Sequence, residues 1–389
     1  MESFAANMKI THLTTSLEIG GAQMMLYRLL DCVQKPNLEY SVVSLMDKGN
    51  LGALIERSGV PVFEVGMRQG SISPSALWRL VQLLRQLQPE VIQAWTYHAN
   101  IAATISTWIM PGRVPVIWSI HHTLDNLRSE KPLTRILIWL GILLSGFPAR
   151  IHYCSHVSAT QHEAIGYVSG LREVIPNGFD CVAFQPSPLA CNKLRQSLGV
   201  SDDTVLIGTI ARYHPMKDHA NFISAANRLV KDRPGVHFVM VGRNVDSSNW
   251  TLVRQIQDAG LESYVHLLGE HHDIRGIVGG LDILSTSSAW GESFPLVVGE
   301  AMACAVPCVV TDVGDSAKLV GHTGIVVPPR DSPALAAAWE KLLMLAPEER
   351  HKLGVAARRR VEEHYSLETM VRAYEDLYVE VRKGRSIGR

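Results

Sequence analysis

An alternation of strand and helix patterns, repeated in two sets, is the feature that most constrains the fold of this chain. Short runs rich in β-branched residues alternate with amphipathic helical patterns. This alternation predicts parallel sheets with helices on both faces, which is an α/β fold. The strands predicted for the first set are 9–13, 40–45, 60–65, 90–95, 114–120 and 149–154. Those of the second set are 205–210, 236–242, 264–269, 281–287, 306–311 and 324–329.

The two sets of strands predict two doubly wound, Rossmann-like domains in series. A chain of 389 residues is also too long for one ordinary hydrophobic core. The segment 176–194 is rich in Pro, Asn and Gly and has no clear period, so we interpret it as the linker. We expect domains over 1–185 and 186–364, and a C-terminal helix over 365–389 that packs back toward the first domain. Ligands of such sheets bind beyond the carboxyl ends of the strands.

Composition excludes several classes of protein. Lys and Arg number 37, as do Asp and Glu, and this balance argues against broad nucleic-acid binding. The six cysteines form no C-x-x-C pair, which predicts free thiols in a reducing compartment and no metal site. No signal peptide is apparent, and the longest apolar run, 136–147, is shorter than the roughly 20 residues of a spanning helix. We therefore expect a cytoplasmic protein.

Charged and small residues follow the first strand of each set. Arg212 and Lys217 come after the strand 205–210, and two cations there suit a diphosphate, although a solvated loop is the alternative. Gly20 and Gly21 stand between the first strand and a helix, where the backbone can approach an anion or form an ordinary turn. The dinucleotide fingerprint G-x-G-x-x-G is not met there, which argues against a nicotinamide dehydrogenase.

The stretch SAWGESFPLVVGEAMACAVP, 288–307, places two glutamates eight positions apart. Glu292 lies among loop formers, whereas Glu300 lies in an apolar helical run, where an unpaired charge is costly. Carboxylates accept hydrogen bonds from hydroxyl groups, so this pair suits a polyhydroxylated ligand. A buried structural salt bridge is the alternative for Glu300. Pro295 fits the first turn of the helix, whose N–H groups favour phosphate.

Several of these motifs resemble one family. The two glutamates before AMACAVP, the cations in ARYHPMKDH and the motif VIPNGFD resemble the retaining glycosyltransferases of family 4, which have the GT-B fold. GGAQ, AWTYHANIAA, VIWSIHHT and VTDVGDSAKLVGHTGIVVPP are similar to the subgroup that builds bacterial O-antigen, capsule and exopolysaccharide. The resemblance covers roughly residues 8–380. It implies two Rossmann-like domains facing each other across a cleft, the first binding the acceptor and the second the nucleotide sugar.

The resemblance implies roles for residues of the second domain. Glu292 would contact hydroxyls of the donor sugar, and Glu300 would hold the ribose. Arg212 and Lys217 would neutralise the diphosphate leaving group. Ser293 and Ala305 stand where the family usually has Gly, which leaves the loop geometry and the sugar choice in question. The implied donor-binding set is Gly20, Gly21, Arg212, Lys217, Glu292, Ser293, Phe294, Pro295, Leu296 and Glu300.

In the first domain the resemblance points to histidines. His121 matches the active-site histidine of the family, and the neighbouring His122 is an alternative. The implied catalytic group is therefore His121 with Glu292, Arg212 and Lys217. We assign His98 and His122 to acceptor binding, although a single histidine is more often structural.

The expected reaction uses no cofactor and no metal. The sequence contains no D-x-D motif, so Arg212, Lys217 and helix N-termini would stabilise the leaving group in place of a divalent ion. A UDP-sugar is the first candidate for the donor, and GDP-mannose is the second. The expected acceptor is a lipid-linked glycan or oligosaccharide at the cytoplasmic face of the inner membrane. Basic flanks around the apolar stretch in 131–150 predict weak peripheral membrane association, and a core helix is the favoured alternative.

Two other functions compete with sugar transfer. A non-hydrolysing UDP-sugar 2-epimerase has the same GT-B fold and needs no acceptor. A nucleotide-sugar-binding protein without catalysis is the second alternative, because Ser293 and Ala305 depart from the family pattern. A nicotinamide dehydrogenase is a distant third.

Overall fold

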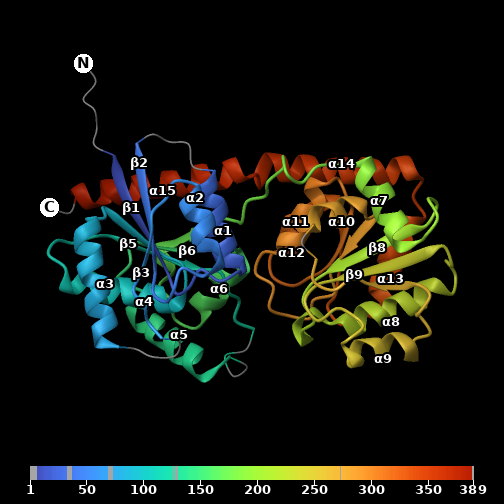
Figure 1. The fold of residues 1–389 in the computed structure, drawn as a ribbon, viewed down its shortest axis with the longest axis horizontal. Coiled ribbons are helices and arrows are strands. Elements are labelled where there is room, and N and C mark those ends of the chain that lie inside the picture. Colours follow the sequence, from blue (N-terminus) through green and yellow to red (C-terminus); the bar gives the residue numbers. More distant parts are fainter. Residues whose placement is uncertain are drawn as a thin grey trace, which may run out of the picture. The chain divides into compact units, whose positions relative to one another are not determined.

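The computed structural model describes residues 7–32, 37–68, 73–125, 127, 130–271 and 273–387, with the backbone alone over 385–387. The chain forms two compact units (Figure 1). Unit 1 comprises Met1–Gly178 and Leu367–Arg389, and unit 2 comprises Phe179–Ser366. Within unit 2 the two ends meet, because Phe179 pairs with Ser366 in a parallel bridge. The chain therefore leaves unit 1 once and returns to it once.

Unit 1 contains a fully parallel sheet of seven strands in the order β3-β2-β1-β4-β5-β6-β7. All six strands predicted for this part of the chain are confirmed, whereas the three-residue strand β7 was not predicted. The strands β1, β2, β4, β5 and β6 are largely buried, as their continuous apolar runs indicate, whereas the edge strands β3 and β7 are partly exposed. The strands are β1 (Met8–Thr14), β2 (Leu38–Ser44), β3 (Val62–Glu64), β4 (Val91–Ala94), β5 (Val116–Ile120), β6 (Arg150–Tyr153) and β7 (Arg172–Val174).

Helices cover both faces of this sheet. α3, α4 and α5 pack against one another in succession, and the last helix of the chain, α15, packs beside α1 and on β4 (Figure 1). The helical elements of unit 1 are α1 (Gly21–Asp31), α2 (Gly49–Arg57), α3 (Pro74–Leu87), α4 (Tyr97–Ile109), α5 (Pro132–Leu144), α6 (His156–Ala164), η2 (Ser169–Leu171) and α15 (Leu367–Ile387).

Unit 2 repeats the plan with a parallel sheet of six strands in the order β10-β9-β8-β11-β12-β13. All six predicted strands are present. They are β8 (Val205–Ile210), β9 (Val236–Val241), β10 (Val265–Leu267), β11 (Ile283–Ser285), β12 (Cys308–Thr311) and β13 (Ile325–Val327). One apolar cluster on this sheet gathers around Phe222 and Trp339, and another around Phe179 and Phe294.

The helices of unit 2 correct one prediction. The segment 176–194 was interpreted as a linker, but α7 begins at Pro188, inside that segment. Ser187 accepts a hydrogen bond from the Ala190 N–H at 3.2 Å, and Pro188 has the fixed φ that suits a first turn. The helical elements are α7 (Pro188–Leu198), η3 (Pro215–Lys217), α8 (His219–Val230), α9 (Trp250–Asp258), α10 (Ile274–Gly280), α11 (Leu296–Ala303), α12 (Ser316–Val320), η4 (Gly321–Thr323), α13 (Ser332–Leu343) and α14 (Pro347–His364).

The strand order of each sheet reverses direction once. In unit 1 the order reverses between β1 and β4, and in unit 2 between β8 and β11. Loops that follow such neighbouring strands diverge to opposite faces, which opens a crevice at the carboxyl edge. The residues that follow β8 and β11 therefore lie where a doubly wound sheet binds its ligand.

Candidate active site

The loop after β8 carries Arg212 and Lys217. Pro215–Lys217 forms the short helix η3, in which the His214 side chain accepts a hydrogen bond from the Met216 N–H. The next residue, Asp218, caps α8 by accepting a hydrogen bond from the backbone. These local bonds fix the turn that places Lys217 at the carboxyl edge of the sheet, as the sequence pattern predicted.

The loop after β11 is bonded to the loop after β8. Ser287 Oγ donates to the carbonyl of Lys217 at 2.8 Å, and the Ala289 N–H donates to the carbonyl of Met216 at 2.8 Å. On its other side, Thr311 at the end of β12 donates to the carbonyl of Ser288 at 2.8 Å. Hydrogen bonds thus join the loop after β8, the loop after β11 and the end of β12 at this edge.

Glu292 and Lys217 are brought together by these loops. The Lys217 ammonium group donates to Glu292 Oε1, and Ser288 Oγ donates to the same oxygen at 2.6 Å. The side chains are 21% and 12% exposed, so the ion pair is partly shielded from water. A shielded pair is stronger than a surface pair but costs more desolvation energy. The contribution of Ser288 was not predicted, because no motif in the sequence points to it.

Glycines allow the backbone to approach Glu292 closely. Gly314 has φ +61°, and a methyl group on it would lie 2.1 Å from the carbonyl oxygen of Glu292. Gly291 has φ +77°, and a methyl group there would lie 2.3 Å from the Met216 side chain. Only glycine can adopt a positive φ and leave out the side chain at these places without strain. The loop geometry beside Glu292 therefore depends on Gly291 and Gly314.

Arg212 points into solvent beside the pair. It is exposed, and no carboxylate in the part of the chain that the structure describes lies within ion-pair distance of it. Its contact with Met216 Sδ is long, at 3.9 Å. The pKa of the nearby His214 is lowered by desolvation and by the charges of Arg212 and Lys217. Arg212 is therefore a cation at this edge that can bind an anion, whereas the charge of Lys217 is balanced by Glu292.

Glu300 lies in α11 with only 8% of its surface exposed. The helix begins at Leu296, and Pro295 is its N-cap residue rather than part of its first turn. Phe179 packs on the residue directly before Glu300, since a methyl group on Gly299 would lie 2.1 Å from the Phe179 ring. Burial raises the pKa of the Cys304 thiol to about 12, Arg358 opposes the rise and Glu300 adds to it.

Ser293, Phe294 and Ala305, which lie around α11, differ in side-chain exposure and in backbone conformation. The Phe294 side chain is buried between Phe179 and Tyr365, with ring centroids 6.1 and 5.5 Å away. Phe294 can therefore offer a ligand only its backbone. Ser293 is partly exposed and has no left-handed φ, whereas Ala305 has φ +57°. Of the two positions where the family usually has glycine, only 305 has a conformation that favours it.

The predicted glycines of unit 1 lie at the start of α1. Gly20 is the N-cap residue, in an extended conformation, and Gly21 is the first helical residue. Neither has a positive φ, so the fold itself does not require glycine here. A methyl group on Gly21 would meet no described atom within 4 Å.

His121 follows β5 and stacks on Trp95, with ring centroids 5.2 Å apart. His152 lies edge-on to it at 5.4 Å. Burial first, and His152 second, hold the pKa of His121 well below its usual range, so the imidazole is neutral. Its Nε2 atom is buried and has no hydrogen-bond partner among the described residues.

His98 and His122 lie near the same edge of the sheet. His98 is in the first turn of α4, and partial burial lowers its pKa. His122 is exposed, packs edge-on against Tyr97 with ring centroids 6.2 Å apart, and bonds Glu130 at 2.9 Å. The structure thus brings the three predicted histidines to the ends of β4 and β5.

The described ranges contain neither a cluster of metal-binding side chains nor a membrane-spanning helix. No group of three or more His, Cys, Asp or Glu side chains there could hold a metal ion. Among the helices described, none is both long and apolar enough to cross a bilayer.

Two family models match the chain in succession. The model described as Glycosyltransferase Family 4 matches residues 19–182, in unit 1 and the start of unit 2. The model described as Glycosyl transferases group 1 matches residues 204–344, in unit 2. The chain belongs to glycosyltransferase family 4. This assignment favours a glycosyltransferase over the epimerase, the non-catalytic binding protein and the dehydrogenase.

Known proteins resemble this family 4 glycosyltransferase over most of its length. It is 24% identical over 292 residues to the N-acetyl-alpha-D-glucosaminyl L-malate synthase of Bacillus anthracis, with 74% of each chain covered. It is 23% identical over 329 residues to the UDP-Gal:alpha-D-GlcNAc-diphosphoundecaprenol alpha-1,3-galactosyltransferase of Escherichia coli, which covers 82% of this chain and 83% of the relative.

A solved structure matches both units. Anabaena Alr3699/HepE in complex with UDP has a TM-score of 0.82 and 25% identity, covering 96% of this chain and 100% of that one. The same Anabaena protein has been solved with UDP-glucose. The family 4 glycosyltransferase therefore has the GT-B fold. A further relative is the lipopolysaccharide core biosynthesis mannosyltransferase LpsB of Rhizobium meliloti, which is 27% identical over 232 residues and covers 57% of this chain and 64% of the relative.

Proposed function

We propose that this chain is a retaining, metal-independent glycosyltransferase that moves a hexose or N-acetylhexosamine from a UDP-sugar to a hydroxyl of a lipid-linked glycan. The pairing of Lys217 with Glu292 at the switch point of unit 2 is the observation that carries the proposal. A nucleotide sugar joins an anionic diphosphate to a polyhydroxylated ring. The Lys217 cation is complementary to the diphosphate, and the Glu292 carboxylate can accept hydrogen bonds from the hydroxyl groups of the ring.

The leaving group would be stabilised by Arg212 and Lys217. As the bond between the anomeric carbon and the phosphate oxygen breaks, the electron pair goes to the diphosphate and positive charge develops on the sugar. Fixed cations stabilise this charge separation without reorganising solvent. The acceptor oxygen attacks from the same face, and its proton passes to the departing phosphate oxygen. Glu292 would meanwhile hold the sugar hydroxyls.

His121 suits a neutral role. Its lowered pKa keeps the imidazole uncharged at neutral pH, so it can donate one hydrogen bond without placing a cation beside the developing positive charge. The buried Nε2 atom has no hydrogen-bond partner in the described part of the chain. A hydroxyl group of the nucleotide sugar would form the missing hydrogen bond. His98 and His122 would contact the acceptor.

UDP is the expected nucleotide, because Alr3699/HepE is known with UDP and UDP-glucose and the E. coli relative is named for a UDP-galactose donor. The name of that relative also includes a diphosphoundecaprenol acceptor, which supports a lipid-linked acceptor here. Titration calorimetry with UDP, GDP, ADP and CMP in EDTA tests the donor site. UDP should bind most tightly. Failure of all four nucleotides to bind, with magnesium restored, would overturn the proposal.

Arg212→Ala gives this titration a matched control. It should weaken UDP binding, whereas Arg254→Ala, which removes an exposed arginine from α9 of the same unit, should not. UDP binding that appears only when magnesium is present would argue against metal independence.

Glu300 can be assigned to the ribose by a double comparison. Glu300→Ala should weaken UDP binding by about 1–3 kcal/mol, as expected for lost hydrogen bonds to a charged group. If Glu300 holds the ribose hydroxyls, wild type should prefer UDP to 2′-deoxy-UDP and the variant should not. An unchanged preference would make this carboxylate structural.

The reaction itself is tested with a lipid-linked acceptor. Product should form only when that acceptor is present, and proton NMR should show the same anomeric configuration as in the donor. Epimerised donor formed without acceptor, or an inverted product, would each contradict the proposal.

A further inference from the structure

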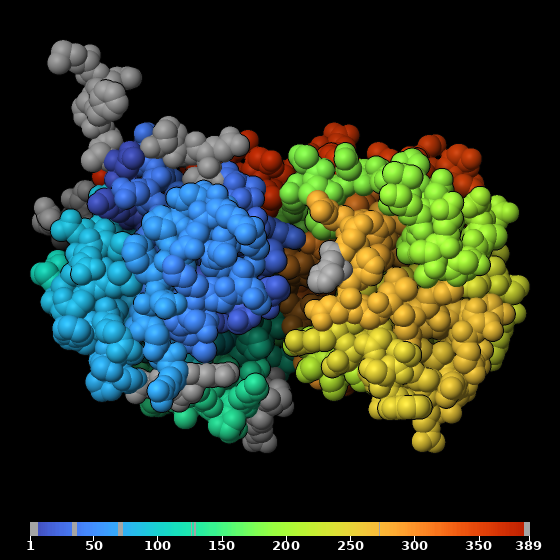
Figure 2. Space-filling view, in the orientation of Figure 1, coloured from blue at the N-terminus to red at the C-terminus, as the bar shows by residue number. Residues whose placement is uncertain are grey.

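Helix α5 is apolar on two opposite sides. Leu137, Ile138 and Gly141 are buried against the core of unit 1. The other side is exposed, and Figure 2 shows the teal-green segment of α5 at the surface of its unit. We define the α4–α5 apolar surface as six large side chains that are 50–61% exposed: Trp108, Ile109, Ile136, Trp139, Leu143 and Phe147.

These six side chains lie on two neighbouring helices, α4 and α5, and on the turn that follows α5. Ile136, Trp139 and Leu143 follow the i, i+3, i+7 spacing of a single helix face. At the far end of α5, the rings of Phe147 and Trp108 are in contact, with centroids 5.1 Å apart. A contiguous group of large exposed apolar side chains commonly marks an interaction site.

The two segments that carry the α4–α5 apolar surface contain only basic charges. The segments 97–115 and 131–150 contain no Asp or Glu. They contain Arg113, Lys131, Arg135 and Arg150, of which Arg150 is paired with Glu380 and the other three form no described ion pair. An apolar surface bordered by cations is complementary to a membrane surface with anionic lipids rather than to a neutral or basic surface.

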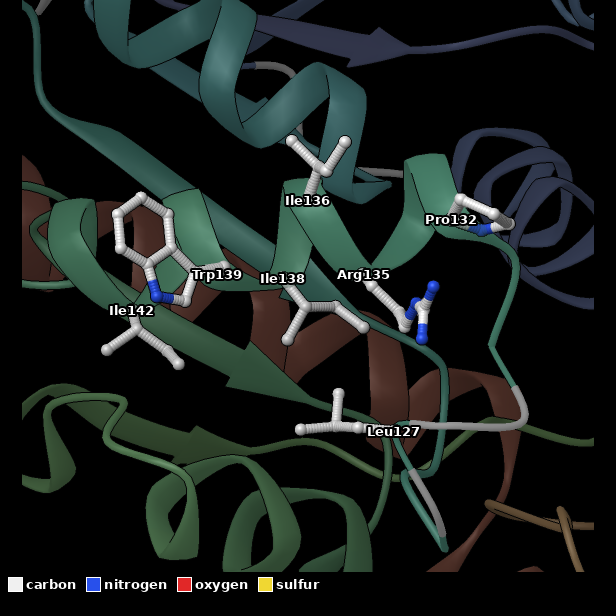
Figure 3. A pocket seen from close by; sticks show the side chains of 7 residues that line it. All are labelled: Leu127, Pro132, Arg135, Ile136, Ile138, Trp139 and Ile142. Carbon is white, nitrogen blue, oxygen red and sulfur yellow. The ribbon is translucent and has the colours of Figure 1, made fainter.

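A pocket of about 420 Å³ lies beside this surface. In Figure 3, Leu127 faces Ile138 across the pocket, and Arg135 lies at its edge. Arg135 is the one charged residue among the described residues that line it. An apolar chain bound there would have a cation beside it, as an anionic lipid requires.

We propose that the α4–α5 apolar surface docks on a bilayer that contains anionic lipid, with α5 lying in the plane of the interface. Two exposed tryptophans favour this partner, because indole rings are enriched where an apolar phase meets water. No helix in the described ranges can span a bilayer, so this contact is peripheral. The proposal rests on exposure and charge, so it can be tested without a sugar donor.

Vesicle co-sedimentation of the full chain tests the proposal. Wild type should bind vesicles that contain one-third phosphatidylglycerol and should bind pure phosphatidylcholine at least tenfold less. Trp139→Ser/Leu143→Ser should reduce binding roughly tenfold or more, since it removes two large apolar anchors. Arg135→Glu should reduce it more than the roughly fivefold expected for loss of one cation, because it also adds a repelled charge.

Trp250→Ser is the matched control, because Trp250 is 82% exposed and lies in α9 of unit 2. It should bind vesicles as wild type does. All variants change exposed positions, and unchanged circular dichroism and thermal midpoints should confirm that they fold. Background binding of wild type, or equal loss in the Trp250 control, would overturn the proposal. So would a wild-type dimer in lipid-free ultracentrifugation that Trp139→Ser/Leu143→Ser converts to monomer, because a second copy would then occupy the surface.

Discussion

Lys217 and Glu292, 75 positions apart in the chain, form an ion pair across the switch point of the second sheet. The pair joins the loop after β8 to the loop after β11, and Ser288 supports the same carboxylate oxygen. In this arrangement the ammonium charge is balanced before any ligand arrives. A diphosphate must therefore share Lys217 with Glu292 or displace it, which links phosphate binding to the position of the carboxylate.

A double-mutant cycle should measure this link. Lys217→Met and Glu292→Gln should each reduce sugar transfer about 100-fold or more. In urea unfolding, the coupling between the two substitutions should be about 1–2 kcal/mol, because the pair is partly shielded from water. The Lys48–Glu56 pair is the control, since its side chains are 42% and 43% exposed and its coupling should be close to zero. Equal coupling in the two cycles would contradict a special role for the site pair.

Ala305→Gly should stabilise the protein. Ala305 has φ +57° just after α11, and a left-handed conformation costs an alanine roughly 1–2 kcal/mol. The greater freedom of glycine in the unfolded chain offsets about 0.4–1 kcal/mol of that gain. We expect a net increase of about 0.5–1 kcal/mol in the free energy of unfolding. Ala356→Gly, within α14, should instead destabilise by about 1 kcal/mol, and the opposite ranking would refute this account.

Gly299→Ala should displace α11. The new methyl group would lie 2.1 Å from the Phe179 ring, and overpacking of this kind costs about 1–3 kcal/mol. Because Glu300 is the next residue, UDP affinity should fall together with stability. Phe179→Leu makes room for the methyl group, so the double variant should be more stable than the sum of the single effects predicts. Simple additivity would show that the two positions do not interact.

Stability should fall as the solution is acidified below about pH 6.5. Burial lowers the pKa of His152 to about 4, although the Ile175 carbonyl opposes the shift. The unfolded state, with a pKa near 6.5, binds more protons over this range, so the free energy of unfolding decreases as pH falls from 6.5 toward 4. Urea unfolding at pH 7.5, 6 and 5 should show a loss of about 2 kcal/mol from His152 by pH 5.

Two substitutions separate this histidine from general acid effects. His152→Asn should flatten the dependence of unfolding free energy on pH, whereas His364→Asn, at an exposed position in α14, should change it less. A profile that His152→Asn leaves unchanged would assign the acid sensitivity to other groups.

Local patterns in the sequence were sufficient to predict most of the fold. Buried parallel strands are continuous apolar runs, so all strands longer than three residues were found. β7 was missed because Arg172–Val174 is short and two of its three residues are charged. The start of α7 was missed because Pro188 was counted as a loop former, although proline also favours a first helical turn.

The site was harder to predict, because its contacts join distant parts of the chain. The motifs indicated that Lys217 and Glu292 both face a ligand, but not that they pair with each other. Nothing near Phe294 indicated that its ring would be buried beside Tyr365. A loop residue is assigned to core or surface only by tertiary packing, which a single sequence does not display.

The double crossing between the units has a consequence for synthesis on the ribosome. Tyr374 and Tyr378 of α15 are fully buried in unit 1, where Tyr374 bonds His152 at 3.2 Å and Tyr378 bonds Gln93. All of Phe179–Ser366 is translated between the sheet of unit 1 and this helix. The unit that emerges first is thus completed last, and until then the strand residues beneath α15 remain uncovered. A nascent chain of this protein therefore has a long period in which its N-terminal half exposes apolar surface that favours aggregation.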